Sequence, residues 1–201
     1  MLRLCLCCCC CQRDFLLQII WKNRLVGDAS NRCLVTVDGT DFRIQEPSPF
    51  NRKWYSSKFN GPGVRYEVGI CIQSGDIVWI HGPFPCGLMP DIRIFRIKLK
   101  DLLLPGEQVI ADKGYRGDPK TCTPFEAKNE CHKKAMSRAR ARHETINGRF
   151  KRWGCLKQVW RHNRTKHYLV FKAVATITQL EMENGRPPFQ VTTYEDPAFI
   201  S

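Results

Sequence analysis

The chain has 201 residues, of which 43% are apolar and 25% are charged. This length suits one domain with a full core, and the composition excludes a disordered chain and a membrane-embedded one. The formal net charge is +13, and residues 131–180 carry most of it, with 13 Lys or Arg against a single acidic residue, Glu144. Such a concentrated basic surface indicates a polyanionic partner, most often nucleic acid; the alternative is a solvated helix face.

The twelve cysteines form two groups, six within residues 5–11 and six scattered ones. No scattered cysteine belongs to a C-x-x-C pair, and adjacent cysteines cannot supply the spaced ligands of a zinc site. We therefore expect the scattered ones, in apolar surroundings, to be reduced core residues of an intracellular protein. They are Cys33, Cys71, Cys86, Cys122, Cys131 and Cys155.

The N-terminal segment, residues 1–30, is expected to be an unstructured Cys-rich start followed by a short helix over residues 14–25. Its apolar run is too short to span a bilayer, and no small-residue cleavage site follows it. The segment therefore predicts neither a membrane span nor secretion. Palmitoylation of the cysteines is the alternative.

Residues 33–85 are typical of strands. β-Branched residues from Cys33 onward predict a strand that leads into Asp-Gly and then Pro, and so runs to a turn. A polar and aromatic loop follows over residues 48–63. Two runs of β-forming residues within 64–85, separated by "QSGD", then predict a hairpin.

The second half of the chain is predicted to be mainly helical. Residues 89–103 have helical spacing, "EQVIAD" is typical of a buried strand that ends at an aspartate, and residues 118–131 have the character of a loop. Two helices follow, over 133–153 and 163–184. The order of strand, hairpin, helix, strand, helix and helix predicts a mixed α/β sheet with helices on its faces.

Glu144 lies off the apolar side of the first of these two long helices. At about 100° per residue, it points roughly 180° to 240° away from the apolar stripe. We therefore expect it outside the core. The alternative is a surface Glu paired within the helix to Arg140 or Lys151. The stripe consists of Ala139, Ile146, Phe150 and Trp153.

Three carboxylates stand where an α/β sheet binds ligands. Asp38 lies in the β-rich "VTVDGT", Asp112 ends "VIADKGY", and Glu144 comes from a helix, so the three can converge at the strand ends. Close carboxylates repel one another and require cations. Mg²⁺ fits because it prefers oxygen ligands and accepts phosphate oxygens in its remaining positions. Two such ions can activate a water and stabilise the leaving oxygen of a phosphodiester.

The stretches "VDGTDFRI", "VIADKGYRG" and "RARARHETINGRFKRW" resemble the three acidic motifs of DDE transposases of the Harbinger-like and bacterial insertion-sequence group. The third motif of that group is Y-x2-R-x3-E-x6-K. Arg140, Glu144 and Lys151 match its R, E and K, while Ser137 stands at the tyrosine position. The resemblance covers residues 33–180. It implies an α/β, RNase H-like mixed sheet flanked by helices, as a nuclease domain over residues 31–183 followed by a tail over 184–201.

The resemblance implies a DDE-type transposase or a transposase-derived endonuclease that cleaves DNA and transfers strands with Mg²⁺ or Mn²⁺. Its catalytic and metal-binding residues would be Asp38, Asp112 and Glu144. The alternative is a catalytically inactive, domesticated or truncated module that binds DNA or protein. Arg140 and Lys151 share one helical face with Glu144, which independently favours DNA contact. The full set of expected DNA-binding residues is Arg140, Arg142, Arg149, Lys151 and Arg152.

Members of this group carry an N-terminal helix-turn-helix region, for which the roughly 30 residues before the first strand leave no room. We therefore expect a fragment, a relic or a nuclease that relies on a separate DNA-binding partner protein, and an oligomer is compatible with either. The expected location is the nucleus or the cytoplasm, in a reducing compartment and away from membranes.

Other polar residues are secondary candidates. Asp41 could replace Asp38 as first ligand, Asp91 is expected to be a helix N-cap, and His143 is expected on the surface. Trp54 and Tyr55 could stack on a nucleobase or pack their loop onto the sheet, and the sequence leaves both interpretations open.

Overall fold

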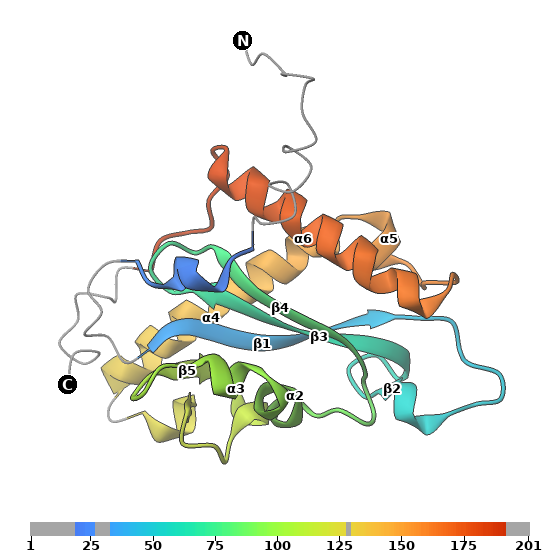
Figure 1. Ribbon diagram of the computed structural model, residues 1–201, viewed down its shortest axis with the longest axis horizontal. Helices are drawn as coiled ribbons and strands as arrows, with labels where there is room; N and C mark the ends of the chain where they lie inside the picture. The colour runs from blue at the N-terminus through green and yellow to red at the C-terminus, as the bar shows by residue number, and fades with distance from the viewer. Residues whose placement is uncertain (1–18, 27–32, 128–129, 192–201) are drawn as a thin grey trace, which may run out of the picture.

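The computed structural model describes residues 19–26, 33–127 and 130–191 (Figure 1). The cysteine run at residues 5–11 and part of the helix expected over 14–25 lie outside these residues. The short 3-10 helices are η1 (Trp21–Arg24), η2 (Arg52–Trp54), η3 (Lys113–Tyr115), η4 (Pro124–Glu126) and η5 (Arg164–Lys166). The strands and α-helices are β1 (Cys33–Arg43), β2 (Tyr55–Ser56), β3 (Gly61–Cys71), β4 (Ile77–Pro85), α2 (Asp91–Ile97), α3 (Leu99–Leu102), β5 (Gln108–Ala111), β6 (Thr121–Cys122), α4 (Glu130–Phe150), α5 (Gly154–Lys157) and α6 (His167–Glu183).

The six strands form one mixed sheet. Its order is β2-β3-β1-β5-β6, and β4 also pairs with β3. The β3–β4 pair is the predicted hairpin, and β1 pairs antiparallel with β3. On the other side of β1, β5 and then β6 run parallel to it, since their connections pass through other elements. The predicted α/β, RNase H-like architecture of a mixed sheet flanked by helices is confirmed.

Helices cover both faces of the sheet (Figure 1). Because side chains alternate along a strand, β1 contributes to two cores. Val35 and Val37 pack with Phe95 of α2 on one face. Phe42 packs with Ile146 of α4 on the other, where α6 also lies. From Val35 onward, odd-numbered side chains of β1 therefore lie on the α2 face and even-numbered ones on the α4 face, whereas the register shift between Cys33 and Val35 interrupts this alternation.

Several predicted elements differ in detail. The strand predicted to lead into Asp-Gly and then Pro continues through Asp38 and Gly39, because β1 pairs with β3 as far as Arg43. The expected loop over 118–131 contains β6, which pairs with β5, and the helix predicted over 89–103 is divided at Lys98. Of the helix expected over 14–25, the described residues contain one 3-10 turn, η1. Propensity cannot show such pairings, because long-range contacts decide them.

The segment after α6 packs against α4 as far as residue 191. Val191 is buried beside Met136 and Ala139, so this part of the predicted tail contributes to a core. Cys71 and Cys86 are buried thiols outside any disulfide, as predicted, whereas Cys155 is exposed. Within the described ranges, none of the helices combines the length and apolar character needed to cross a bilayer.

Candidate functional site

Asp38 lies in β1, and Asp112 directly follows β5, the adjacent parallel strand. Val37 of β1 pairs with Ala111 of β5, and each aspartate is the next residue along its chain. Alternation then fixes the face: Ile110 packs on α4 residues, so Asp112, two positions later, points to the same side. Asp38 lines a cavity with α4. Two segments far apart in the sequence thus bring two carboxylates to the α4 face of the sheet.

The electrostatics of Asp38 reflect this arrangement. One oxygen of Asp38 accepts a hydrogen bond from the Gly39 N–H at 2.8 Å, and one oxygen of Asp112 accepts from the Gly114 N–H at 2.8 Å. Burial is the main cause that raises the pKa of Asp38, and the negative charge of Asp112 raises it further. Nearby positive charge and the Gly39 N–H oppose these effects without cancelling them. A cation placed beside the pair would relieve the repulsion.

Glu144 faces this pair from α4. It is exposed and lines a cavity of about 310 Å³ together with Asp38 and Arg140. Its predicted position off the core is confirmed. Within the described residues, however, no group of three or more His, Cys, Asp or Glu side chains is arranged so that it could hold a metal ion. The third carboxylate therefore borders the same cavity without completing a ligand cage.

A second cavity, of about 380 Å³, is also lined by Asp38. It is lined by Asp38 and by four basic side chains from three parts of the chain. Asp38 lines both cavities, so the two cavities share this carboxylate. Basic walls around an acidic centre are suited to a polyanion held by its phosphates at a metal-binding position. The four basic residues are Arg43, Lys58, Lys151 and Lys157.

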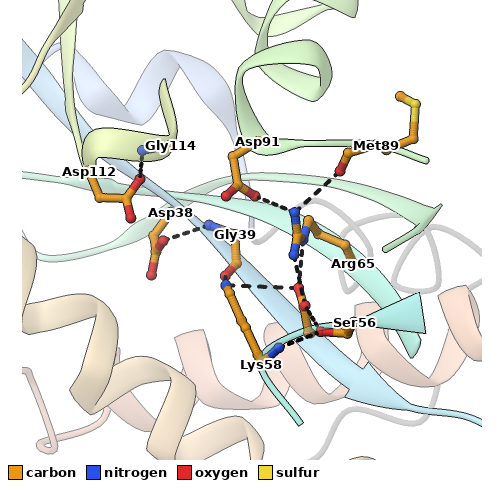
Figure 2. A network of polar contacts seen from close by, with 10 residues as sticks. Asp38, Gly39, Ser56, Lys58, Arg65, Met89, Asp91, Asp112 and Gly114 are labelled. Carbon is orange, nitrogen blue, oxygen red and sulfur yellow. Dashed lines mark hydrogen bonds and ion pairs between the residues drawn. The ribbon is translucent and has the colours of Figure 1, made fainter. Parts of the chain in front are cut away.

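Arg65 organises a second group of acids on the opposite face of the sheet (Figure 2). Its Nε and Nη2 donate to the two oxygens of Asp41 at 2.7 and 2.9 Å, and its Nη1 lies 3.2 Å from Asp91. Ser56 donates a further hydrogen bond to Asp41. These contacts hold the pKa of Asp41 below its usual value despite burial. Asp41 is thus bound within the fold, which argues against its role as an alternative ligand.

Asp91 differs from the sequence-based expectation. The N-cap of α2 is Pro90, and Asp91 occupies the first turn with its carboxylate directed at Arg65. A Cβ at Gly39 would lie 2.2 Å from one oxygen of Asp91, and a Cβ at Gly114 would lie 3.0 Å from the other. The glycines of "DG" and "DKG" therefore both make room for one carboxylate. In the sequence, the only sign of this close approach was a glycine one or two residues after each candidate aspartate.

The basic residues of α4 divide between its two sides. Arg140 lines the cavity of Glu144, and Lys151, just beyond the helix, lines the second cavity. Arg142 is only 1% exposed, and its guanidinium donates to backbone carbonyls, among them that of Cys71 at 3.2 Å and that of Ile72. The expectation that Arg142 contacts DNA is therefore wrong, since its side chain is enclosed.

Arg149 and Arg152 also have partners within the protein. Arg149 donates to the carbonyl of Arg186 at 2.6 Å, and Arg152 pairs with Glu181 of α6 at 3.1 Å. Both contacts are on the side of α4 that faces α6 and the segment after it. These contacts do not test whether either residue also binds DNA, and neither residue lines the two cavities beside Asp38.

His143 is buried at 2% exposure, so its expected surface position is wrong. It lines the cavity of Glu144, and burial lowers its pKa to about 4. Trp54 packs partly against the core, which favours the packing interpretation for this residue. Tyr55 remains exposed, so its two interpretations stay open.

Comparison with known proteins identifies relatives of this arrangement. A family model described as DDE superfamily endonuclease matches residues 37–179, which include Asp38, Asp112 and Glu144. A probable transposase for insertion sequence element IS702 from Microchaete diplosiphon is 27% identical over 177 residues. The alignment covers 80% of this chain and 62% of that relative, so the chain spans less than two thirds of the relative's length. No solved structure matches the chain.

Proposed function

The chain belongs to the DDE superfamily endonucleases, and we propose that it uses Mg²⁺ or Mn²⁺ to cleave DNA phosphodiester bonds and to transfer the cut strand. The observation that carries this proposal is the adjacency of Asp38 and Asp112 on paired parallel strands, with Glu144 across a shared cavity. The relative from Microchaete diplosiphon is named a probable transposase, which agrees with this reaction class.

The donor set fits hard divalent cations. Asp38 and Asp112 offer carboxylate oxygens, the ligands preferred by Mg²⁺ and Mn²⁺. Burial raises the pKa of Asp38 and the charge of Asp112 raises it further, so a cation bound beside the two carboxylates would stabilise their ionised forms. Glu144 would join them as the third ligand once the cavity holds ions and substrate. A divalent ion bound there would polarise the phosphate and lower the pKa of a bound water.

The chain's own side chains would bind and orient the DNA. Arg140 and Lys151 border the two cavities that meet at Asp38, so they can donate to phosphate oxygens on either side of the scissile bond. His143 is buried and its pKa is lowered, so its side chain would be neutral at physiological pH. It would therefore not neutralise the nearby charge of Asp112, which would remain available to a cation. The basic groups thus fix the backbone, while the acids face the reacting phosphate.

The biological setting forms part of the proposal. A separate DNA-binding partner protein or self-association would supply recognition of the DNA ends. A reducing compartment, nuclear or cytoplasmic, would keep the buried thiols of Cys71 and Cys86 reduced. The nuclease domain is proposed to span residues 31–183.

The test is nicking of supercoiled plasmid DNA with Mg²⁺ or Mn²⁺. Asp112→Asn should reduce nicking to the background observed with EDTA, while leaving the fold intact. Asp101→Asn serves as the matched control, because Asp101 is exposed on α3 and lines neither cavity beside Asp38. Equal nicking by the wild type and Asp112→Asn would remove Asp112 from the mechanism.

A second candidate function is a DNA-binding module without catalysis. The absence of a completed ligand cage within the described ranges favours it. Such a module would bind DNA with a steep dependence on salt and would nick no DNA with any divalent ion. The nuclease proposal requires the opposite result, so the same plasmid assay separates the two.

A further inference from the structure

Lys58 reaches the part of β1 that carries Asp38 from outside that strand. It follows β2, in the turn that leads into β3, and its side chain extends back to β1 (Figure 2). The Lys58 Nζ donates to the Gly39 carbonyl at 2.8 Å and lies 4.0 Å from an oxygen of Asp41. Its side chain is 48% exposed. The ammonium group is therefore held at the peptide that follows Asp38, yet it is open to solvent.

The charge of Lys58 acts on the acids of both faces of the sheet. Burial raises the pKa of Asp38 and Asp91, and the charge of Lys58 opposes this rise; for Asp41, it adds to the contacts that lower the pKa. Asp41 and Asp91 already have Arg65 as an ion-pair partner. For Asp38, by contrast, Lys58 has the largest effect of any charged group, ahead of both Asp112 and Arg140. Lys58 is thus a positive charge held at the peptide that follows Asp38, and both residues line one cavity.

Lys58 also lines the cavity of about 380 Å³, in which Lys151 and Lys157 stand. A Lys side chain is a flexible point charge with three donors, and the Gly39 carbonyl uses one of them. The other donors can serve an oxygen that enters the cavity. The position suits a phosphate group next to the acidic pair, because Asp38 borders the same space.

We propose that Lys58 is a DNA-contacting residue that first acts as a tethered cation beside Asp38 and then donates to a phosphate oxygen of bound DNA. This inference rests on the proposed nuclease function and adds a residue outside the three acidic motifs. A structural role alone, in which Lys58 only fastens the turn before β3 to β1, would also explain the hydrogen bond to Gly39. The two roles differ in their effect on metal binding.

The decisive experiment combines Mn²⁺ titration, DNA binding and nicking for Lys58→Met. Loss of the resident charge should tighten Mn²⁺ binding about tenfold at low salt, because a like charge no longer opposes the divalent ion. DNA binding should weaken, with the slope of log K against log salt concentration reduced by about 1, as for one lost phosphate contact. Nicking at saturating Mn²⁺ should fall.

Two further variants control for folding and for charge in general. Lys58→Arg should keep DNA binding near the wild-type level, and Lys58→Gln provides a second neutral side chain if Lys58→Met unfolds at a lower temperature. Lys53→Met removes an equal charge from the same part of the chain, where Lys53 lies over the Trp54 ring and outside the cavity. Lys53→Met should leave Mn²⁺ affinity unchanged.

The possible failures are distinguishable. Unchanged or weaker Mn²⁺ binding by both neutral Lys58 variants, beside a wild type that binds Mn²⁺ and nicks DNA, would overturn the role of Lys58 alone. A wild type that neither binds Mn²⁺ nor nicks DNA would overturn the proposed function, and the proposed role of Lys58 would fail with it.

Discussion

Asp38 and Asp41 lie three positions apart on one strand, so their side chains point to opposite faces of the sheet. Their pKa values are shifted in opposite directions. Asp41 is bonded by Arg65 and Ser56, and its pKa is lowered. Asp38 faces Asp112 beside a cavity, and its pKa is raised. A buried carboxylate that is ion-paired within the protein stabilises the fold. A carboxylate held next to another negative charge is instead available to bind a ligand.

The strongest contrast is expected from replacing these two aspartates in turn. Asp38→Asn should lower Mn²⁺-dependent nicking by more than about a hundredfold, since it removes a metal ligand. Its free energy of unfolding should remain unchanged or rise, because the substitution removes a charge that Asp112 repels. Nicking assays beside urea denaturation check both parts, and a strongly destabilised Asp38→Asn would break the contrast.

Asp41→Asn should have the opposite profile. It leaves Arg65, which is 8% exposed, without its closest counter-charge, and breaking such a buried pair costs about 3 kcal/mol of folding free energy. Urea denaturation measures the loss. A destabilisation smaller than about 1 kcal/mol, the usual size for an exposed pair, would show that the network contributes little.

Gly39→Ala tests whether the close approach of the Asp91 carboxylate requires a glycine at position 39. A Cβ at this position would lie 2.2 Å from an Asp91 oxygen, so we expect a cost of about 1 to 3 kcal/mol. In the Asp91→Ala background the same substitution should cost clearly less, because the obstructing oxygen is gone. Gly148→Ala is the control, since no atom obstructs a Cβ there. Additive costs in the double variant would refute the steric explanation.

The last prediction concerns pH dependence and Glu67, a buried acid on the Arg65 face that accepts a hydrogen bond from Trp79. Burial raises its pKa to about 8 from 4.5, so the folded state retains a proton that the unfolded state releases. Its contribution to stability is complete below pH 4.5 and falls as the pH rises to about 8, by at most roughly 1.4 kcal/mol per pH unit. Glu67→Gln should remove this slope in thermal unfolding measured across the same range. An unchanged slope would mean that Glu67 is ionised in the fold.

Local patterns were sufficient to predict most of the fold. The alternating β-forming runs predicted the hairpin, and helical periodicity predicted α4 and α6, because burial of one face leaves a regular trace in the sequence. Charge alone could not assign the arginines of α4. Arg142 lies about 200° round the helix from Arg140, on the buried side, where its guanidinium meets backbone carbonyls that no sequence pattern reveals.

The candidate site was predictable only in part, for a similar reason. Asp38 and Asp112 each follow a buried run within their own segment, so their side chains could be placed locally. The pairing of Asp91 with Arg65, and the reach of Lys58 to Gly39, join segments that only the folded sheet brings together. Helix-cap preference was therefore a poor guide to Asp91.

The most direct test of the central claim is a calorimetric titration of Mn²⁺ into the wild type, Asp38→Asn and Asp112→Asn. We predict saturable binding by the wild type and its loss in both variants, with each variant still folded by circular dichroism. Equal Mn²⁺ binding by all three proteins would contradict the assignment of these two aspartates as the metal-binding pair.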